Sequence, residues 1–155
     1  MARASRTRSI DAPAERVWEI VADPNHLPRW WPLASRVEDV QEAGDGGSAR
    51  WTVLLKTQRG TGVRADFSRT VWEPVARLGW AQQVAGSPFE RILKASSVAI
   101  AIRPEGDGAV VTLTSDETLR GFSRLGAPMM RRAAGRRLAE ALGNLDRALT
   151  GHGDA

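Results

Sequence analysis

Two adjacent carboxylates in the second half of the chain are the residues best placed for acid–base chemistry. Asp116 and Glu117 lie in a stretch in which apolar residues alternate with others, as Val111, Leu113 and Leu119 do. Neighbouring side chains of a strand point to opposite faces, so this alternation turns Glu117 towards the apolar side. A carboxyl group in an apolar pocket has a raised pKa and can donate or accept a proton.

Three roles are open for Glu117: half of an internal ion pair, an anchor for a ligand, or a catalytic acid–base group. Arg69 is the candidate partner for the ion pair, because it shares the alternation of Phe67 and Val71. A bulge in the strand would reverse the alternation and turn Asp116 inwards instead. Glu117 is therefore the one weak catalytic candidate, and it is also a candidate for binding.

Aromatic and polar side chains at strand spacing supply the other candidates for a pocket. Adjacent tryptophans of a short helix, Trp30 and Trp31, cannot face one way, so one is expected in the core and the other at a pocket. The inward aromatic residues of the strands provide apolar contact area, and a methionine near the last helix adapts to varied ligands. The predicted ligand-binding residues are Trp31, Trp51, Phe67, Arg69, Trp80, Gln82, Ser115, Glu117 and Met130.

The composition excludes several kinds of site. The 155 residues include no cysteine, no tyrosine and two histidines. Disulfides, thiolate metal sites, cysteine nucleophiles and an all-histidine zinc site are therefore excluded. The nucleotide-binding, hydrolase and zinc-protease motifs GxGxxG, GxxxxGK[ST], GxSxG and HExxH are absent as well. We expect neither a metal nor a cofactor.

The charge is uneven along the chain, although the total is +4 from 22 basic and 18 acidic residues. Between Thr118 and Ala139 there is no acidic residue, and the arginines there are Arg120, Arg124, Arg131, Arg132, Arg136 and Arg137. This segment is interpreted as a solvated helix face, with a surface for an anionic partner as the alternative. We expect no nucleic acid partner, and the sequence leaves a homodimer open.

Neither end of the chain nor its interior predicts a membrane segment. The basic start is followed by Ile10-Asp11-Ala12-Pro13, where a signal peptide would have an apolar stretch. No uncharged apolar run approaches the roughly 20 residues that cross a bilayer. We expect a cytoplasmic protein without integral membrane contact.

The periodicity of apolar residues predicts helices at both ends and strands between them. A strand is expected over 5–10, a helix from Pro13 to about Val21, and a short helix after Asp23-Pro24. From 37 to 119 the period of two predicts about six antiparallel strands, with turns at 44–47, 59–62, 86–88 and 105–108. The last helix carries one apolar stripe, made by Met130, Ala134, Leu138, Leu142, Leu145 and Leu149.

This order predicts one domain over residues 1–155 in which the sheet curls around the last helix. One helix does not fill the hollow of a wide curved sheet, so a cavity is expected between them. Two glycines of the last helix, Gly135 and Gly143, would let another element approach closely.

The segment from Ile10 to Trp18, followed by Asp23-Pro24 and by Leu27-Pro28-Arg29-Trp30-Trp31-Pro32, resembles the SRPBCC superfamily. This is the START-like, helix-grip group that includes polyketide cyclase/dehydrase and lipid-transport proteins. The resemblance implies an α+β, helix-grip (START/Bet v 1-like) fold, in which a curved antiparallel sheet surrounds a long C-terminal helix. It also implies a deep hydrophobic cavity for lipids, polyketides, hormones or other apolar molecules.

The sequence and the resemblance together predict that the chain binds a small hydrophobic or amphipathic ligand of lipid-, polyketide- or aromatic-like chemistry. Glu117, Arg69, Gln82 and Ser115 would orient it. The alternative is an enzyme of the polyketide cyclase/dehydratase type, with Glu117 as the proton carrier. A third class is an interaction module that uses the arginine-rich start of the last helix.

Overall fold

The computed structural model describes residues 2–42, 49–56 and 62–151. A seven-stranded antiparallel sheet has the order β1-β7-β6-β5-β4-β3-β2. The predicted turn at 44–47 and most of that at 59–62 lie outside the described residues. The strands are β1 (Ala2–Ile10), β2 (Ala34–Gln41), β3 (Arg50–Leu55), β4 (Val63–Glu73), β5 (Arg77–Gln82), β6 (Leu93–Glu105) and β7 (Gly108–Leu119).

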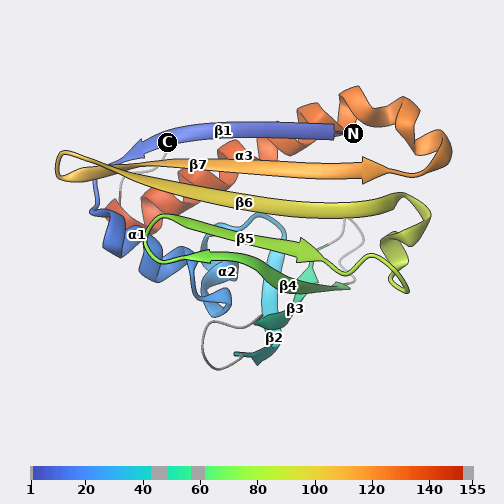
Figure 1. Ribbon diagram of the computed structural model, residues 1–155, viewed down its shortest axis with the longest axis horizontal. Coiled ribbons are helices and arrows are strands. Elements are labelled where there is room, and N and C mark those ends of the chain that lie inside the picture. The colour runs from blue at the N-terminus through green and yellow to red at the C-terminus, as the bar shows by residue number, and fades with distance from the viewer. Residues whose placement is uncertain (1, 43–48, 57–61, 152–155) are drawn as a thin grey trace.

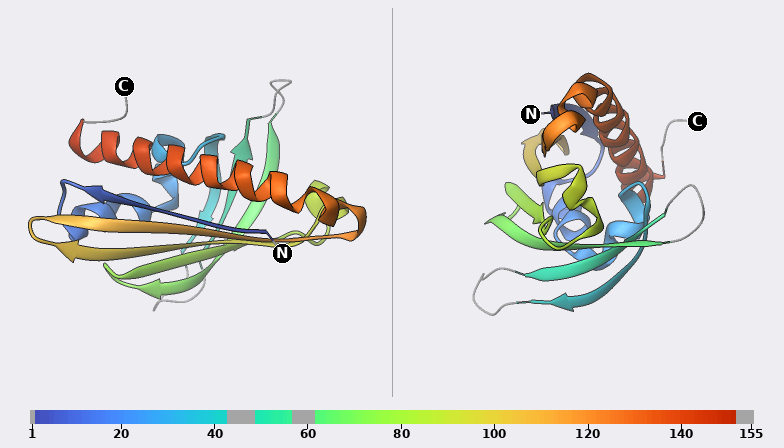
Figure 2. Two further views of the ribbon diagram at one scale, coloured as in Figure 1. Left: turned by 90° about the horizontal axis from the view of Figure 1, so that it is seen from above. Right: turned by 90° about the vertical axis from the view of Figure 1, so that its right-hand side faces the viewer.

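The sheet curves around the long C-terminal helix, as Figure 1 and Figure 2 show from three sides. Two shorter helices, α1 and α2, connect β1 to β2 and close one end of the hollow. The α+β, helix-grip fold and its curved antiparallel sheet are confirmed. The helices are α1 (Ala14–Val21), α2 (Leu27–Trp30) and α3 (Ala127–Thr150), with 3-10 turns η1 (Pro24–His26), η3 (Pro88–Arg91) and η4 (Gly121–Gly126).

Local chemistry sets the ends of the helices where the sequence predicts them. The Asp23 carboxylate accepts a hydrogen bond from the backbone N–H of Asn25 at 3.0 Å and so caps η1. Helix α3 begins with Pro128 in its first turn and ends at Gly151, whose φ of 75° belongs to the left-handed region. The predicted stripe of α3 is confirmed, since Ala134, Leu138 and the leucines after them are buried.

The first strand and the last helix are tied together across the edge of the sheet. Arg8 of β1 donates from Nε to the Asp146 carboxylate of α3 at 2.8 Å, and the Thr150 hydroxyl donates to the same carboxylate at 2.8 Å. An added Cβ at Gly135 would run into the Arg6 guanidinium, so the close approach expected at this glycine comes from a side chain of β1. These contacts hold α3 over the hollow of the sheet.

A bulge in β4 makes one sequence prediction wrong. The register with β5 shifts between Arg69 and Val71, so two steps along β4 correspond to one along β5. Val71, predicted to share the inward face of Phe67, is therefore exposed. Trp72 takes the inner side instead, where it packs against Trp18 of α1 with ring centroids 4.9 Å apart and remains 37% exposed.

Candidate ligand-binding site

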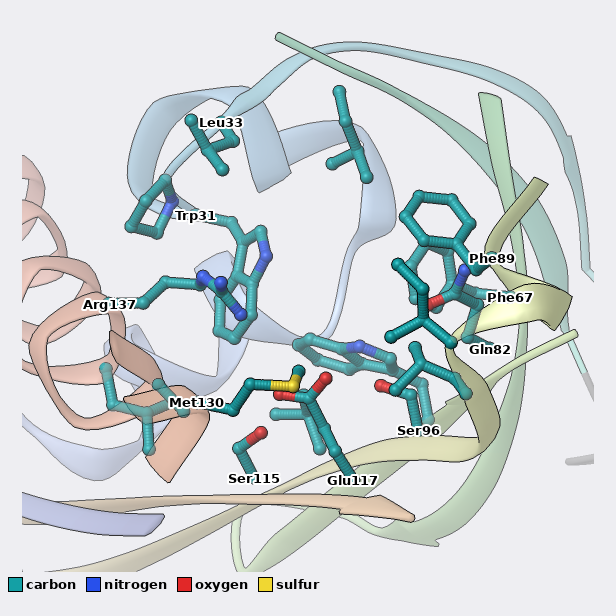
Figure 3. A pocket seen from close by; sticks show the side chains of 18 residues that line it. Trp31, Leu33, Phe67, Gln82, Phe89, Ser96, Ser115, Glu117, Met130 and Arg137 are labelled. Carbon is teal, nitrogen blue, oxygen red and sulfur yellow. The ribbon is translucent and has the colours of Figure 1, made fainter. Parts of the chain in front are cut away.

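A cavity of about 320 Å³ lies between the sheet and the first half of α3. Figure 3 shows its walls: α3 on one side, the segment after α2 on another, and strands β4 to β7 below. Apolar side chains make up most of the lining, including Leu55, Phe89, Leu93, Val98 and Leu138. This is the predicted position of the hollow, at the small end of the roughly 300–1,000 Å³ range of ligand pockets.

Aromatic rings form one wall of the cavity and a layer behind it. Trp80 packs edge-on against Trp31 at 5.5 Å, Trp51 at 6.2 Å and Trp30 at 6.3 Å between ring centroids. Trp31, Trp80 and Phe67 line the cavity, whereas Trp30 and Trp51 are outside its lining and pack against Trp80. The second layer holds the lining rings in fixed orientations.

Glu117 of β7 points into the cavity, as the alternation of its strand predicts (Figure 3). Only 8% of the residue is exposed to solvent. Burial raises the pKa of its carboxyl above the ordinary 4.5, and the positive charge of Arg137 opposes part of that rise. Asp116 points to the other side of the sheet and pairs with Arg3 at 3.0 Å. A carboxyl that holds its proton to higher pH is thus directed at the ligand space.

Other polar groups lie around Glu117 at separate points of the wall. Ser115 is two residues before it on β7, and Ser96 is its partner across the β6–β7 ladder. Gln82 reaches the cavity from the end of β5, and its buried Nε2 has no hydrogen-bond partner within the described residues. Such isolated polar groups orient a ligand that apolar surfaces bind.

The predicted ion pair between Arg69 and Glu117 is wrong. Arg69 does not line the cavity; its guanidinium lies 3.9 Å above the ring of Trp72 and 3.4 Å from the Glu42 carboxylate. The bulge in β4 is the physical reason, because it brings Trp72 to the same side as Arg69 and provides a stacking partner there. Arg137 of α3 is the charged group that acts on Glu117.

The structure brings most of the predicted ligand-binding residues together around one cavity. Trp51 and Arg69 lie outside its lining, and the predicted residues that line it are Trp31, Phe67, Trp80, Gln82, Ser115, Glu117 and Met130. Their role in binding stays a prediction.

Sequence reasoning missed Arg137, Ser96 and Phe89 among the lining residues. Arg137 lies seven residues after Met130 and next to Leu138, so the helical stripe contained its position. Because Arg137 is charged, the sequence predicts that it lies on a solvated face of the helix instead. That interpretation does describe its neighbours, because Arg131, Arg132 and Arg136 are exposed.

The described residues hold no cluster of three or more histidine, aspartate or glutamate side chains that could bind a metal ion. None of the helices in the described ranges is long and apolar enough to cross a membrane.

The profile of the family described as polyketide cyclase / dehydrase and lipid transport matches residues 1–150. No curated protein matches the sequence.

Three solved structures have the same fold. A START superfamily protein from Mycobacterium smegmatis is 17% identical with a TM-score of 0.80, over 97% of this chain and 99% of that one. The ZhuI aromatase/cyclase from Streptomyces sp. R1128 is 19% identical with a TM-score of 0.74, over 98% of both chains. The di-domain ARO/CYC StfQ, from the steffimycin biosynthetic pathway, is 12% identical with a TM-score of 0.76, over 97% of this chain and 51% of its own. At these sequence identities the similarity shows that the fold is shared.

Proposed function

Because the chain belongs to the polyketide cyclase / dehydrase and lipid transport family, we propose that its cavity binds one small hydrophobic or amphipathic molecule of lipid-, polyketide- or aromatic-like chemistry, without a cofactor. The observation that carries this proposal is the cavity of about 320 Å³, whose mainly apolar wall carries a few separate polar groups. If side chains filled the interior between the sheet and α3, as they do in a close-packed core, no cavity of this size would remain.

Affinity comes mainly from the burial of apolar ligand surface, at about 25 cal/mol per Å². The rings of Trp31, Phe67 and Trp80 offer flat contact surfaces, and Met130 can adjust to the outline of the ligand. The limited volume favours a medium-length acyl chain or a few fused rings over a large lipid. Ser96, Ser115, Gln82 and Glu117 fix the orientation.

A cavity-filling substitution tests this function. Ala134 is buried on the cavity side of α3, so Ala134→Leu places extra carbon atoms in the ligand space. Ala133→Leu is the matched control, because the neighbouring residue does not line the cavity. Isothermal titration calorimetry with dodecanoate and 2-naphthoate is expected to show binding by the wild type and the control, and at least about tenfold weaker binding by Ala134→Leu.

Thermal unfolding without ligand shows whether each variant is folded before it is titrated. If Ala134→Leu folds and binds both compounds as the wild type does, the ligand lies elsewhere and the proposal is wrong. If the wild type binds neither compound, the proposal is also wrong.

A polyketide cyclase/dehydratase activity is the second candidate, and the position of Glu117 favours it. A buried carboxyl with a raised pKa in the ligand space can take a proton from carbon between two carbonyls and return one to a departing hydroxyl. Two neighbours in fold, ZhuI and StfQ, are named as an aromatase/cyclase and an ARO/CYC.

The test of this activity is mass spectrometry of the products formed from a poly-β-ketone thioester. Glu117→Gln is expected to abolish cyclisation and loss of water, while Asp116→Asn retains them because Asp116 points to the other side of the sheet. Turnover that survives in a folded Glu117→Gln variant would exclude this mechanism.

A further inference from the structure

The cavity wall carries one cationic side chain that forms no ion pair with a carboxylate among the described residues. Arg137 is half-buried on α3 and is the one arginine or lysine in the described lining. Two other arginines on the inner side of the sheet have a carboxylate nearby: Arg8 pairs with Asp146, and Arg69 lies near Glu42. Arg137 and Glu117 influence each other electrostatically, but no ion pair joins them.

Several polar groups of the cavity lining can donate hydrogen bonds. A guanidinium such as that of Arg137 has five N–H donors and no acceptor. Gln82 adds a buried Nε2 that lacks an acceptor within the described residues, and the Ser96 and Ser115 hydroxyls can donate as well. A ligand group that accepts hydrogen bonds is therefore the matching partner for Arg137.

A positive charge in a half-buried, mainly apolar space favours an anionic acceptor over a neutral one, because charge-assisted hydrogen bonds strengthen away from water. One arginine balances one negative charge. A phosphate would bring a second charge for which the described lining has no partner, whereas a carboxylate matches the planar guanidinium with two parallel bonds.

We propose that the cavity selects amphipathic carboxylates, with the apolar body among Phe67, Trp80 and Leu138 and the carboxylate at Arg137. Figure 3 shows the geometry: Arg137 extends from α3 across the cavity near Trp31, while Glu117 points into the same space from β7. This selection rests on the function proposed above and narrows it to a class of ligand.

The experiment compares each acid with its neutral amide, so that the apolar body stays constant. The probes are dodecanoate with dodecanamide and 2-naphthoate with 2-naphthamide, measured by calorimetry at neutral pH. The wild type is expected to bind each acid at least about tenfold more tightly than its amide, the usual effect of a charge-assisted hydrogen bond.

Variants of two adjacent arginines assign the preference to one side chain. Arg137→Gln is expected to bring the ratio of acid to amide affinity close to one, and Arg137→Lys to retain part of the preference. Arg136→Gln removes the same charge from the exposed neighbour and is expected to keep the wild-type ratio.

The outcomes separate this inference from the function on which it rests. Equal binding of acids and amides by the wild type would overturn the selection of carboxylates and leave the ligand-binding function intact. A preference that survives in Arg137→Gln would also overturn it. If none of the four probes binds, both the selection and the function are wrong.

Discussion

Glu117 is a buried residue whose pKa is raised above its ordinary value. It is buried in the wall of the cavity, and desolvation outweighs the opposing charge of Arg137, so its pKa rises. The same burial that makes it a candidate proton carrier carries a cost in stability once the group ionises. Binding and stability are therefore linked to pH through one side chain.

The dependence of stability on pH tests the state of Glu117. Because its pKa is raised in the folded protein, its favourable contribution is complete below 4.5 and is lost as pH rises through the folded value. Relative to Glu117→Gln, which does not titrate, the wild type is expected to lose free energy of unfolding over that window. Urea denaturation of both proteins at a series of pH values measures the difference, and a constant difference across the series would contradict a raised pKa.

The sequence predicts the inward position of Glu117 because the period of two in β7 is unbroken from Val111 to Leu119. It does not predict the partner of Glu117. Arg69 and Arg137 both occupy positions that can face the inside of the fold. The sequence does not indicate which of the two lies in the cavity. Packing in the folded protein determines this, because the Arg69 guanidinium stacks 3.9 Å above the ring of Trp72 and so stays out of the cavity.

At the scale of elements, the structure departs from the alternation of apolar residues at the bulge in β4. A bulge adds one residue to one strand and reverses the faces beyond it. The alternation of Phe67 and Val71 gives no sign of this insertion, whereas β6 from Ala95 onwards and β7 keep a regular register to the hairpin. The fold class follows from the sequence because it depends on the many regular positions.

Paired substitutions in β4 test the reversed faces. Trp72→Thr removes the contacts with Trp18 and Arg69 and is expected to lower the free energy of unfolding by about 1–2.5 kcal/mol. Val71→Thr, on the exposed face, is expected to change it by less than about 0.5 kcal/mol. Chemical denaturation measures both values, and a larger loss for Val71→Thr would show that the bulge is absent.

Alanine substitutions at two glycines test how closely neighbouring elements pack against β1. At Gly135 an added Cβ meets the Arg6 guanidinium, a flexible and exposed group that can move aside, so Gly135→Ala is expected to stabilise α3 by up to about 1 kcal/mol. At Gly108 the added Cβ would lie 2.6 Å from the backbone oxygen of Ile10, which cannot move alone. Gly108→Ala is therefore expected to destabilise the protein by about 1–3 kcal/mol.

Thermal and urea unfolding of the two variants should differ in sign. If Gly135→Ala destabilises as much as Gly108→Ala does, α3 and β1 pack backbone to backbone at that point and the account of their contact is wrong.

At the scale of the whole molecule, the proposed function depends on the space that the sheet and α3 leave between them. The sequence predicts this hollow, because one amphipathic helix is set against a wide sheet with one apolar face. It does not predict its volume or its charged group. Both follow from which residues of α3, Met130 and Arg137 among them, turn towards the strands.

A crystal structure with 12-bromododecanoate tests the central claim most directly, because anomalous scattering locates the bromine without reference to the protein. We expect its peak inside the cavity, among Phe67, Trp80 and Leu138, with the carboxylate at Arg137. A peak only on the outer face of the sheet, or an unoccupied cavity at saturating ligand, would contradict the account.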